Sequence, residues 1–517
     1  MGAEAVPAID ISGQVKPWWE RRWFLALVVL ATMVPLIYPQ FPPFVDLPGH
    51  LGHYRVELDV GHSPSLGRYY GFHWAPIGNL GVDLLIIPLG RLFGLEPAVK
   101  LIVLAIPPLT AIGMLWVARE VHDRMPPTAL FALPFIYGAP FLFGFLNFTL
   151  SVALAFLAFA LWLRLGRLDQ TRLRGWLFAP IGLITFFCHT YGWALLGLMC
   201  FSAEVVRLRD RGRPWWRAGL EAALHASVMA LPLLVMLASP IDSRGGMAGD
   251  WFDWDAKWVG LYGALRDRWG PFDVSSLEFA GVILAFAILS PKLSFSRNLA
   301  VLAIVLVLSF VMLPRYIFDS AYADVRLLPY LFAVTLLAIH LCKPEDRRLG
   351  QFLAIFALAF FGVRLAGTTA SMAMAASDQQ AKLGALAHIP RGARVASFYG
   401  LSYAEPWALQ RNSHLGGFVI ARREGFSNDQ WITVGHNLLV LKYREAGTFA
   451  ANPSQVVRPN GTHDGVYRTI DDALAEVPKD KFDYIWLISA PPFDQRLVGD
   501  LQPVWSGPGT TLYRIAH

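Results

Sequence analysis

Charged side chains are scarce in this 517-residue sequence. Asp, Glu, Lys and Arg make up 16% of the residues, whereas 55% are hydrophobic. Soluble domains carry about 25% charged residues, so the composition excludes an ordinary soluble protein over most of the chain. Apolar stretches near the ~20 residues that are needed to cross a bilayer recur from Trp23 to Ala376. The composition therefore predicts a polytopic α-helical membrane protein.

Cysteine is also scarce. Cys188, Cys200 and Cys342 all lie in or beside apolar segments, which excludes a disulfide framework and a cysteine-based zinc site. The first apolar run lacks a small-residue cleavage site after a short core, so we expect a retained helix and not a removed signal peptide. The net charge of +6 arises in loops between apolar runs, which indicates topology and not nucleic-acid binding.

Basic residues gather in six loops, and placing all six in the cytoplasm predicts eleven spans across the inner membrane. The N-terminus is then inside, and the end of the chain is extracytoplasmic. The clusters are Lys16/Arg21/Arg22, Arg119/Arg124, Arg164/Arg167/Arg172/Arg174, Arg207/Arg209/Arg211/Arg213/Arg217, Lys292/Arg297 and Lys343/Arg347/Arg348. The predicted spans are 23–39, 99–118, 127–145, 147–164, 175–189, 190–206, 216–238, 276–291, 298–313, 325–342 and 350–374.

One apolar stretch, Gly81 to Gly94, is too short to span comfortably and contains Asp83, Pro88 and Arg91. Counting it as a crossing would place the arginine-rich loops outside. We therefore predict a juxtamembrane or re-entrant helix within a long first outer loop, from about residue 39 to 97.

After Ala376 the residue composition becomes that of an ordinary soluble domain. This change predicts a membrane domain over 1–376 and a soluble extracytoplasmic α/β domain over 377–517. Strands are predicted at 393–398, 482–488 and 511–515, and helices at 379–389 and 471–477. We find no glycine-rich phosphate loop, nucleophile elbow or metal-ligand spacing in this region. Its polar residues, such as His414, His436 and Asn437, are interpreted as parts of a solvated fold, with a supporting or acceptor-recruiting role as the alternative.

Ionisable residues in or beside a bilayer are costly and indicate function. Four groups are predicted on the outer face of the membrane domain. They are Asp46 with His50 and His53, His189 between two spans, the loop 314–329 with Arg315, Asp319, Asp324 and Arg326, and Arg364 inside the last span.

Each group also has a purely structural interpretation. Asp46 is suited to capping the helix that follows it, and the histidines to an interfacial or turn position. Arg364 could extend to the headgroups, and Arg315 and Arg326 could anchor the membrane edge. Positive residues are less expected on the outer side, which favours a phosphate contact for Arg326, since arginine matches phosphate geometry.

The order of these elements resembles the GT-C superfold of membrane glycosyltransferases, in particular bacterial families similar to protein O-mannosyltransferases and lipid A aminoarabinose transferases. The resemblance rests on FVDLPGH after the first span, GNLGVDLL…RLFGLEPAVKL, VAREVHDR, GFLNFTLSVALAFLAFALWLR, and ADVRLLP before a late span. It covers the membrane domain, and the soluble tail also fits the plan of these families.

The resemblance implies transfer of a sugar from a polyprenyl-phosphate donor to an envelope glycan, lipid or protein acceptor on the outer face. Asp46 would be the general base and Arg326 the ligand of the donor phosphate. The family often has a second acidic residue in the first loop, for which Glu57, Asp59 and Asp83 are candidates. Metal use varies in this superfold, so we assign no metal ligand and leave the use of a divalent metal open. The further substrate-binding candidates are His50, His53, Asp83, His189, Arg315, Asp324 and Arg364.

Two other functions remain open from the sequence. A transporter or flippase for a lipid-linked or envelope glycan would use the same ionisable residues to line a pathway, although no internal repeat relates two halves of the chain. A non-catalytic assembly protein is the third interpretation.

Overall fold

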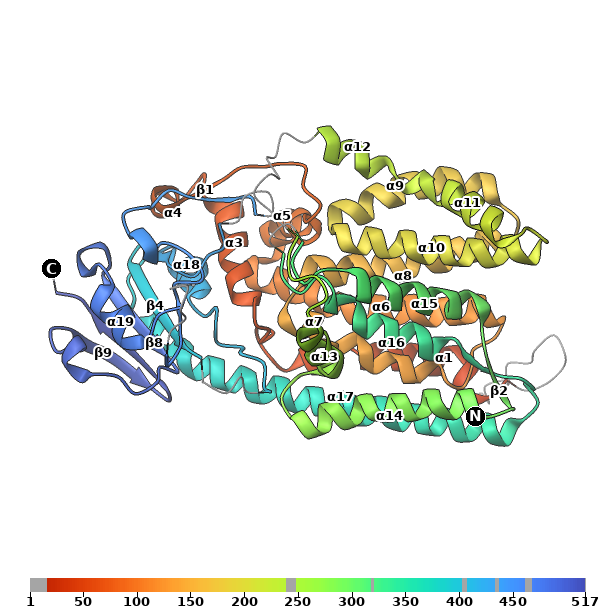
Figure 1. Cartoon of the computed structure of the whole chain (residues 1–517). Helices are drawn as coiled ribbons and strands as arrows, with labels where there is room; N and C mark the ends of the chain where they lie inside the picture. The colour runs from red at the N-terminus through yellow and green to blue at the C-terminus, as the bar shows by residue number, and fades with distance from the viewer. Residues whose placement is uncertain are drawn as a thin grey trace, which may run out of the picture.

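The computed structural model describes residues 16–238, 248–317, 320–401, 407–432, 437–460 and 467–516. Asp319 and His436 lie outside these described residues. Figure 1 shows a bundle of helices with a smaller part that contains the main β-sheet at one end. We call this end of the bundle the domain end, and the other the opposite end.

The first predicted span is a broken helix. Helix α1 (Arg22–Ala31) is followed by α2 (Val34–Ile37), which has Pro35 in its first turn. Proline lacks a backbone N–H and cannot continue the hydrogen-bond ladder of a preceding helix. The hydroxyl of Thr32, at the break, donates to the carbonyl of Val29.

Each of the other predicted spans coincides with a helical segment. These are α6 (Leu95–His122), η2 (Ala129–Tyr137) with α7 (Ala139–Phe143), α8 (Leu146–Arg167), α9 (Thr171–Cys188), α10 (Thr190–Asp210), α11 (Trp215–Ala226) with η3 (Ser227–Met229) and α12 (Leu231–Ala238), α14 (Gly270–Leu289), α15 (Arg297–Met312), η6 (Val325–Leu327) with α16 (Leu328–Leu337), and α17 (Arg347–Leu383). Shorter elements join them: η1 (Trp18–Glu20), α13 (Trp254–Tyr262), η5 (Gly263–Leu265) and the hairpin of β2 (Leu293–Phe295) with β3 (Ile339–Leu341).

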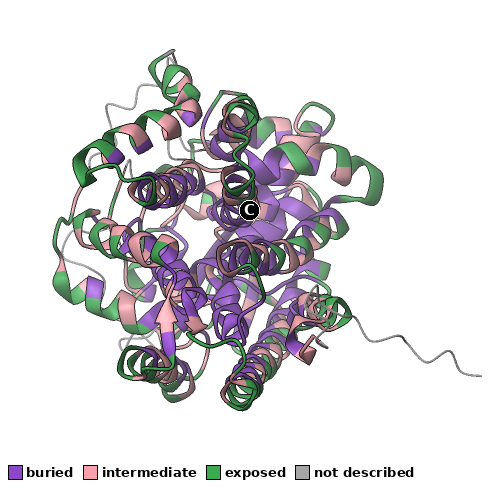
Figure 2. Cartoon of the chain, turned by 90° about the vertical axis from the view of Figure 1, so that its right-hand side faces the viewer, coloured by how far each residue is buried: buried purple, intermediate pink, exposed green. Residues whose placement is uncertain are grey.

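Five helices of the described chain are long and apolar enough to cross a membrane, and a sixth if the pair bent by 62° after Met229 is one span. The bundle surface agrees with this composition, since Leu237, Ile288 and Leu289 expose 83%, 72% and 82% of their surface. Figure 2, seen from the opposite end, shows buried residues in the middle and exposed ones around them. The protein is therefore a multi-pass membrane protein, and the count of eleven spans stays a prediction.

The first predicted outer loop is folded. It contains α3 (Leu47–Asp59), α4 (Pro64–Tyr69), β1 (Tyr70–Phe72) and α5 (Gly81–Phe93). Helix α5 ends at Gly94, whose φ of 84° lies in the left-handed region that favours glycine. A helix of 13 residues rises about 20 Å, less than the ~30 Å hydrocarbon core, which supports a juxtamembrane position. Figure 1 shows α5 at the domain end.

The C-terminal part is built on a mixed sheet with the strand order β5-β4-β8-β10-β9, and β7 pairs with β4. Strand β4 is parallel to each of its neighbours, β5, β7 and β8. Strand β10 is antiparallel to the two strands beside it, β8 and β9. The strands are β4 (Arg394–Gly400), β5 (Phe426–Ser427), β7 (Val456–Val457), β8 (Tyr484–Ile488), β9 (Gln502–Gly507) and β10 (Thr510–Arg514). The helical segments are η7 (Gly384–His388), α18 (Gly417–Arg423), η8 (Gly447–Phe449), α19 (Ile470–Glu476), η9 (Lys479–Lys481) and η10 (Gln495–Val498).

The predicted strands at 393–398, 482–488 and 511–515 correspond to β4, β8 and β10. Strand β9 was missed because it is an edge strand, paired with β10, and all six of its residues are exposed or half-buried. The sequence therefore lacks the run of apolar residues that made β8 recognisable, where all five residues are buried.

The first loop and the C-terminal part share one core. Strand β1 pairs with β6 (Leu439–Leu441), and Val56 and Leu66 belong to the same buried cluster as Phe398 and Ile485. The predicted boundary at 376/377 also falls inside α17. Residues of the first loop therefore help to build the sheet-containing part.

The orientation can be tested by cysteine labelling. We expect Arg91→Cys, on the exposed end of α5, to react with a membrane-impermeant maleimide from outside, because the domain end is predicted to be extracytoplasmic. Arg348→Cys, exposed at the opposite end, is the matched control and should react only after permeabilisation. Both belong in a Cys342→Ser background, since Cys342 is exposed whereas Cys188 and Cys200 are buried. Labelling of Arg91→Cys only from the cytoplasm would contradict the predicted topology.

Candidate functional site

Asp46 lies where the first span ends and α3 begins. Its backbone N–H donates to the carbonyl of Phe143 at 2.8 Å, and the backbone turns beside it at Gly144, whose φ is 99°. Asp46 occupies the N-cap position of α3, but its side chain makes no capping hydrogen bond. The capping role that the sequence left open is therefore not what the carboxylate does, and its oxygens face other groups.

The imidazole of His414 faces this carboxylate. Its Nε2 lies 3.7 Å from Oδ1 of Asp46, and its Nδ1 lies 2.6 Å from Oδ1 of Asp429. His414 precedes α18 and Asp429 follows β5, so the C-terminal part brings both to the membrane domain. The result is a carboxylate–imidazole–carboxylate row. His414 is 8% exposed, so its interpretation as a solvated residue was wrong.

Burial and neighbouring charges shift the pKa values of the groups in this row. Burial raises the pKa of Asp46 to about 6, against the opposing influence of the positive charges of His414 and Arg326. Burial lowers the pKa of His414, but the Asp429 carboxylate outweighs burial and raises it overall. A carboxylate with a pKa near 6 is suited to accept a proton at neutral pH, because a general base works best when its pKa lies near the working pH.

Glycine makes the approach between α3 and α18 close enough for this row. A Cβ at Gly417 would lie 2.0 Å from the carbonyl oxygen of Pro48, and one at Gly49 would lie 2.6 Å from the Trp431 ring. Any side chain at Gly417 would push α18 away from α3. Trp431 in turn covers His414, with ring centroids 4.6 Å apart. The contact therefore requires glycine at both positions, because glycine has no Cβ atom.

His50 lies on the same face of α3 as Asp46, one turn further along. Its ring centroid is 5.2 Å from that of Trp431 and 6.1 Å from that of Tyr54. Burial lowers the pKa of His50 to about 4, so at neutral pH it is an uncharged member of the wall beside Asp46. His53 lies further along α3 and is hydrogen-bonded at 2.8 Å to Asp83, which lies in the first turn of α5.

Arg326 is buried near Asp46 without a carboxylate partner. Its Nη2 donates to the hydroxyl of Ser320 and the carbonyl of Ala321, at 3.1 and 2.9 Å. Its guanidinium lies 4.2 Å from the ring centroid of Phe145 and 5.3 Å from that of Tyr191. Its Nε is buried and has no hydrogen-bond partner among the described residues. A buried cation of this kind is costly unless an anion joins it.

The other buried cations at the domain end are paired with carboxylates. Lys257 binds Asp324 at 2.9 Å, Arg364 binds Asp273 at 2.8 Å, and Arg411 binds Asp267 at 2.5 Å. Asp324 and Arg364, which were both site candidates, are therefore engaged in ion pairs that hold helices and loops together. Arg326 differs from these cations in lacking such a partner within the described chain.

The remaining candidates are His189 and Arg315. His189 is the N-cap of α10, accepts the N–H of Tyr191 at 3.1 Å and packs against Phe148, whose ring also faces Arg326. It therefore shapes the aromatic wall around the guanidinium. Arg315 lies over the ring of Tyr322, 4.9 Å from its centroid.

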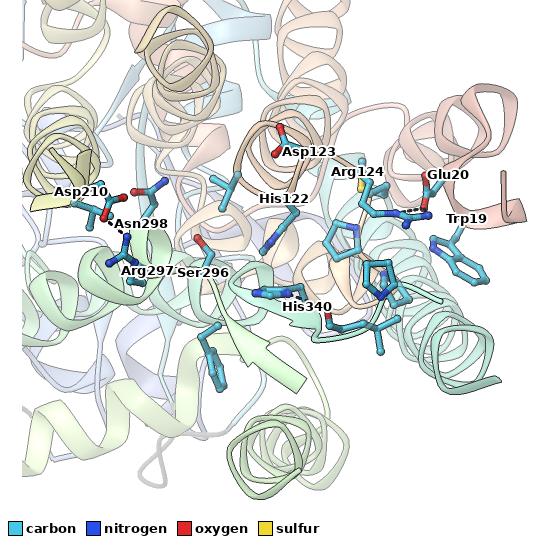
Figure 3. Close-up of a pocket in the computed structure, with 18 residues that line it drawn as sticks. Trp19, Glu20, His122, Asp123, Arg124, Asp210, Ser296, Arg297, Asn298 and His340 are labelled. Carbon is cyan, nitrogen blue, oxygen red and sulfur yellow. Dashed lines mark hydrogen bonds and ion pairs between the residues drawn. The ribbon is translucent and has the colours of Figure 1, made fainter. Parts of the chain in front are cut away.

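A cavity of about 440 Å³ lies at the opposite end of the bundle (Figure 3). The close-up shows His122 and His340 near each other, with ring centroids 5.0 Å apart. Its ion pairs join Arg124 to Glu20 and Arg297 to Asp210. These charges are satisfied, unlike that of Arg326, and the cavity is separate from the Asp46 site.

Sequence reasoning missed His414, Asp429 and Trp431. Nothing in the local pattern around them marks a site, because their neighbours in the chain are those of an ordinary loop and a short strand. Glycines in LPGHLGH and SHLGGF are the signal that was present, since they mark the two surfaces that meet.

Comparisons with known proteins bear on the fold. No protein-family model matches the chain, and no curated protein matches it. The chain is similar to a crystal structure of ArnT from Cupriavidus metallidurans bound to undecaprenyl phosphate, with a TM-score of 0.50 and 12% identity. The apo state of the same protein gives a TM-score of 0.51 and 13% identity, and both matches cover 95% of this chain and 97% of the other. The fold that the resemblance implies is therefore confirmed.

Proposed function

We propose that the protein is an integral membrane glycosyltransferase that moves a sugar from a polyprenyl-phosphate donor to an acceptor at the domain end of the bundle. The observation that carries the proposal is the nearness of a proton-accepting carboxylate, Asp46, to the buried guanidinium of Arg326, which has no carboxylate partner within the described residues and whose Nε is unsatisfied. The GT-C fold supports it, as does the undecaprenyl phosphate bound to the structurally similar ArnT.

Arg326 is suited to the donor phosphate. Phosphate would supply the missing negative charge, and a charge-assisted contact to the free Nε would satisfy the orphaned donor. The aromatic rings of Phe145, Phe148 and Tyr191 surround the guanidinium. They exclude water and strengthen its electrostatic effect. The apolar outer surface of the bundle would accommodate the prenyl chain.

Asp46 would accept the proton of the acceptor hydroxyl. The acceptor oxygen then bonds to the anomeric carbon, and the bond from that carbon to the phosphate oxygen breaks. The bonding electrons leave with the polyprenyl phosphate, whose negative charge Arg326 stabilises. The proton remains on Asp46, and Asp429 holds the imidazole of His414 beside the Asp46 carboxylate.

The transporter interpretation receives less support from this arrangement. Asp46, His414 and Arg326 gather at one end of the bundle, whereas the substrate sites of secondary transporters lie near the bilayer midplane. Transfer of a radiolabelled sugar from polyprenyl phosphate by the purified protein in liposomes would separate the two. Movement of the lipid-linked sugar across the bilayer without transfer would favour the transporter.

We expect Asp46→Asn to reduce transfer by at least about 10²-fold, the lower range for loss of a general base. The carboxamide keeps the size of the side chain but cannot accept the proton. Thermal unfolding should change little, because the side chain makes no capping bond. Asp59→Asn, at the other end of α3, is the matched control and should stay active, since Asp59 forms only a partly exposed pair with Arg55. Full activity of Asp46→Asn would refute the general-base role.

The pH dependence of transfer should report the same carboxylate. Because Asp46 is inactive when protonated, kcat/KM should fall as pH decreases through about 6, well above the usual 3.8. His414→Gln removes a positive charge that lowers the pKa of Asp46, so the acid limb should move to higher pH. Arg326 and Asp429 also face this group and remain in place. An acid limb near pH 4, or one unmoved by His414→Gln, would contradict the assignment.

We expect Arg326→Ala to weaken donor binding and to slow transfer together. A hydrogen bond to a charged group contributes about 1.5–3 kcal/mol, so the affinity for polyprenyl phosphate should fall roughly ten- to a hundredfold. Arg326→Lys should restore only part of it, because an ammonium cannot make the bidentate contact. Arg315→Ala, on the same loop, is the control. A larger loss of affinity in Arg315→Ala than in Arg326→Ala would show that Arg315, and not Arg326, binds the donor phosphate.

A further inference from the structure

A second cluster of ionisable residues lies between α3 and α5. His53 and Glu57 are one turn apart on the same face of α3, and Asp83 reaches them from the first turn of α5. One ligand atom from each residue lies within 4.8 Å of the others. His53 Nε2 and Asp83 Oδ1 are 2.8 Å apart. The three side chains therefore converge on one small volume.

Glu57 has no partner there. Both of its carboxylate oxygens are buried, and neither has a hydrogen-bond partner among the described residues. Its neighbour Asp83 is itself acidic, so the two would repel each other as carboxylates. An unsatisfied buried carboxylate is costly, and a cation between Glu57 and Asp83 would satisfy both. This orphaned group is the observation, independent of the clustering, that indicates a ligand.

The surroundings hold Asp83 in place. Asn147 Nδ2 lies 3.3 Å from Oδ2 of Asp83, and Asn147 Oδ1 accepts the backbone N–H of Val82. The ring of His53 packs against Phe72, with centroids 5.3 Å apart. Hydrogen-bonded carboxylates and an apolar wall are typical surroundings of metal ligands, because they fix the ligands and limit the access of water.

We propose that His53, Glu57 and Asp83 bind one divalent transition-metal ion, Zn²⁺ or Mn²⁺, that joins α3 to α5. The donor set of one imidazole and two carboxylates suits zinc, which accepts nitrogen and oxygen ligands, and also manganese. Magnesium and calcium prefer oxygen ligands throughout. The two carboxylates balance the charge of the ion. Ligands at zinc distances of 2.0–2.2 Å lie about 3.3 Å apart in a tetrahedron, so the observed spacing needs only small side-chain rotations.

The metal would position the catalytic end of α3 without touching the reacting atoms. Asp46, His50, His53 and Glu57 follow one another at intervals of four, three and four residues, so they share one face of the helix. Seven residues separate Asp46 from His53, a rise of about 10 Å. Fixing α3 to α5 at the far end of this stripe sets the rotation of the helix and therefore the direction of Asp46.

Metal binding can be measured without any transfer assay, so its failure is distinct from failure of the proposed function. The full-length protein in detergent, stripped with EDTA, is titrated with ZnCl₂, MnCl₂ or MgCl₂ by calorimetry. Bound metal is then counted by plasma mass spectrometry. We expect about one equivalent of Zn²⁺ or Mn²⁺, a thermal unfolding temperature that rises with either ion, and no comparable effect of Mg²⁺.

Glu57→Gln is the decisive variant, and Asp59→Asn on the same helix is its matched control. Glu57→Gln should weaken Zn²⁺ or Mn²⁺ binding at least tenfold, whereas Asp59→Asn should bind as the wild type does. Without metal, Glu57→Gln should unfold at about the same temperature as the stripped wild type, because the amide has the size of the acid and removes no hydrogen bond within the described residues. Absence of a bound equivalent in the wild type, or unchanged binding in Glu57→Gln, would overturn the proposal.

Discussion

The close contact of α3 with α18 is the constraint on which the candidate site depends. Gly417 lies so near the backbone at Pro48 that no side chain fits between them. This approach brings the C-terminal part onto the first segment after the opening span, and it places His414 beside Asp46. The contact is backed by a shared core, in which residues of the first loop pack with the sheet. The C-terminal part is therefore a structural component of the site.

Buried charge organises the rest of the domain end. Desolvation makes an isolated buried ion costly, and most of the buried cations here are neutralised by carboxylates from neighbouring helices or loops. Those pairs fasten the bundle together. Two buried groups depart from this pattern within the described chain: Arg326 has no carboxylate partner, and the carboxylate oxygens of Glu57 have no hydrogen-bond partner. Each departure coincides with a proposed ligand, phosphate for the first and a metal ion for the second.

Part of the fold could be predicted because it depends on local sequence. Each span that the apolar runs and basic loops predicted is helical in the structure, although the short helix α13 was not predicted. The strands that correspond to β4 and β8 were recognisable from their apolar residues. The short length and polar residues of Gly81–Phe93 indicated a helix that does not span, as the structure supports. Strand β9 and the pairing of β1 with β6 were not predicted, because an exposed strand and a three-residue pair carry almost no pattern.

The sequence by itself determined that this is a helical membrane protein, and it predicted the fold that the solved structures share, with Asp46 and Arg326 as the leading site candidates. Composition, hydrophobic runs and the order of loose motifs are properties of residues that are neighbours in the chain, so they can be recognised from the sequence alone. Only the tertiary structure decided that Arg364 and Asp324 are engaged in ion pairs. It alone joined His414 to Asp46 and Glu57 to Asp83. These contacts link residues far apart in the chain, and they exist because close packing fixes which distant side chains meet.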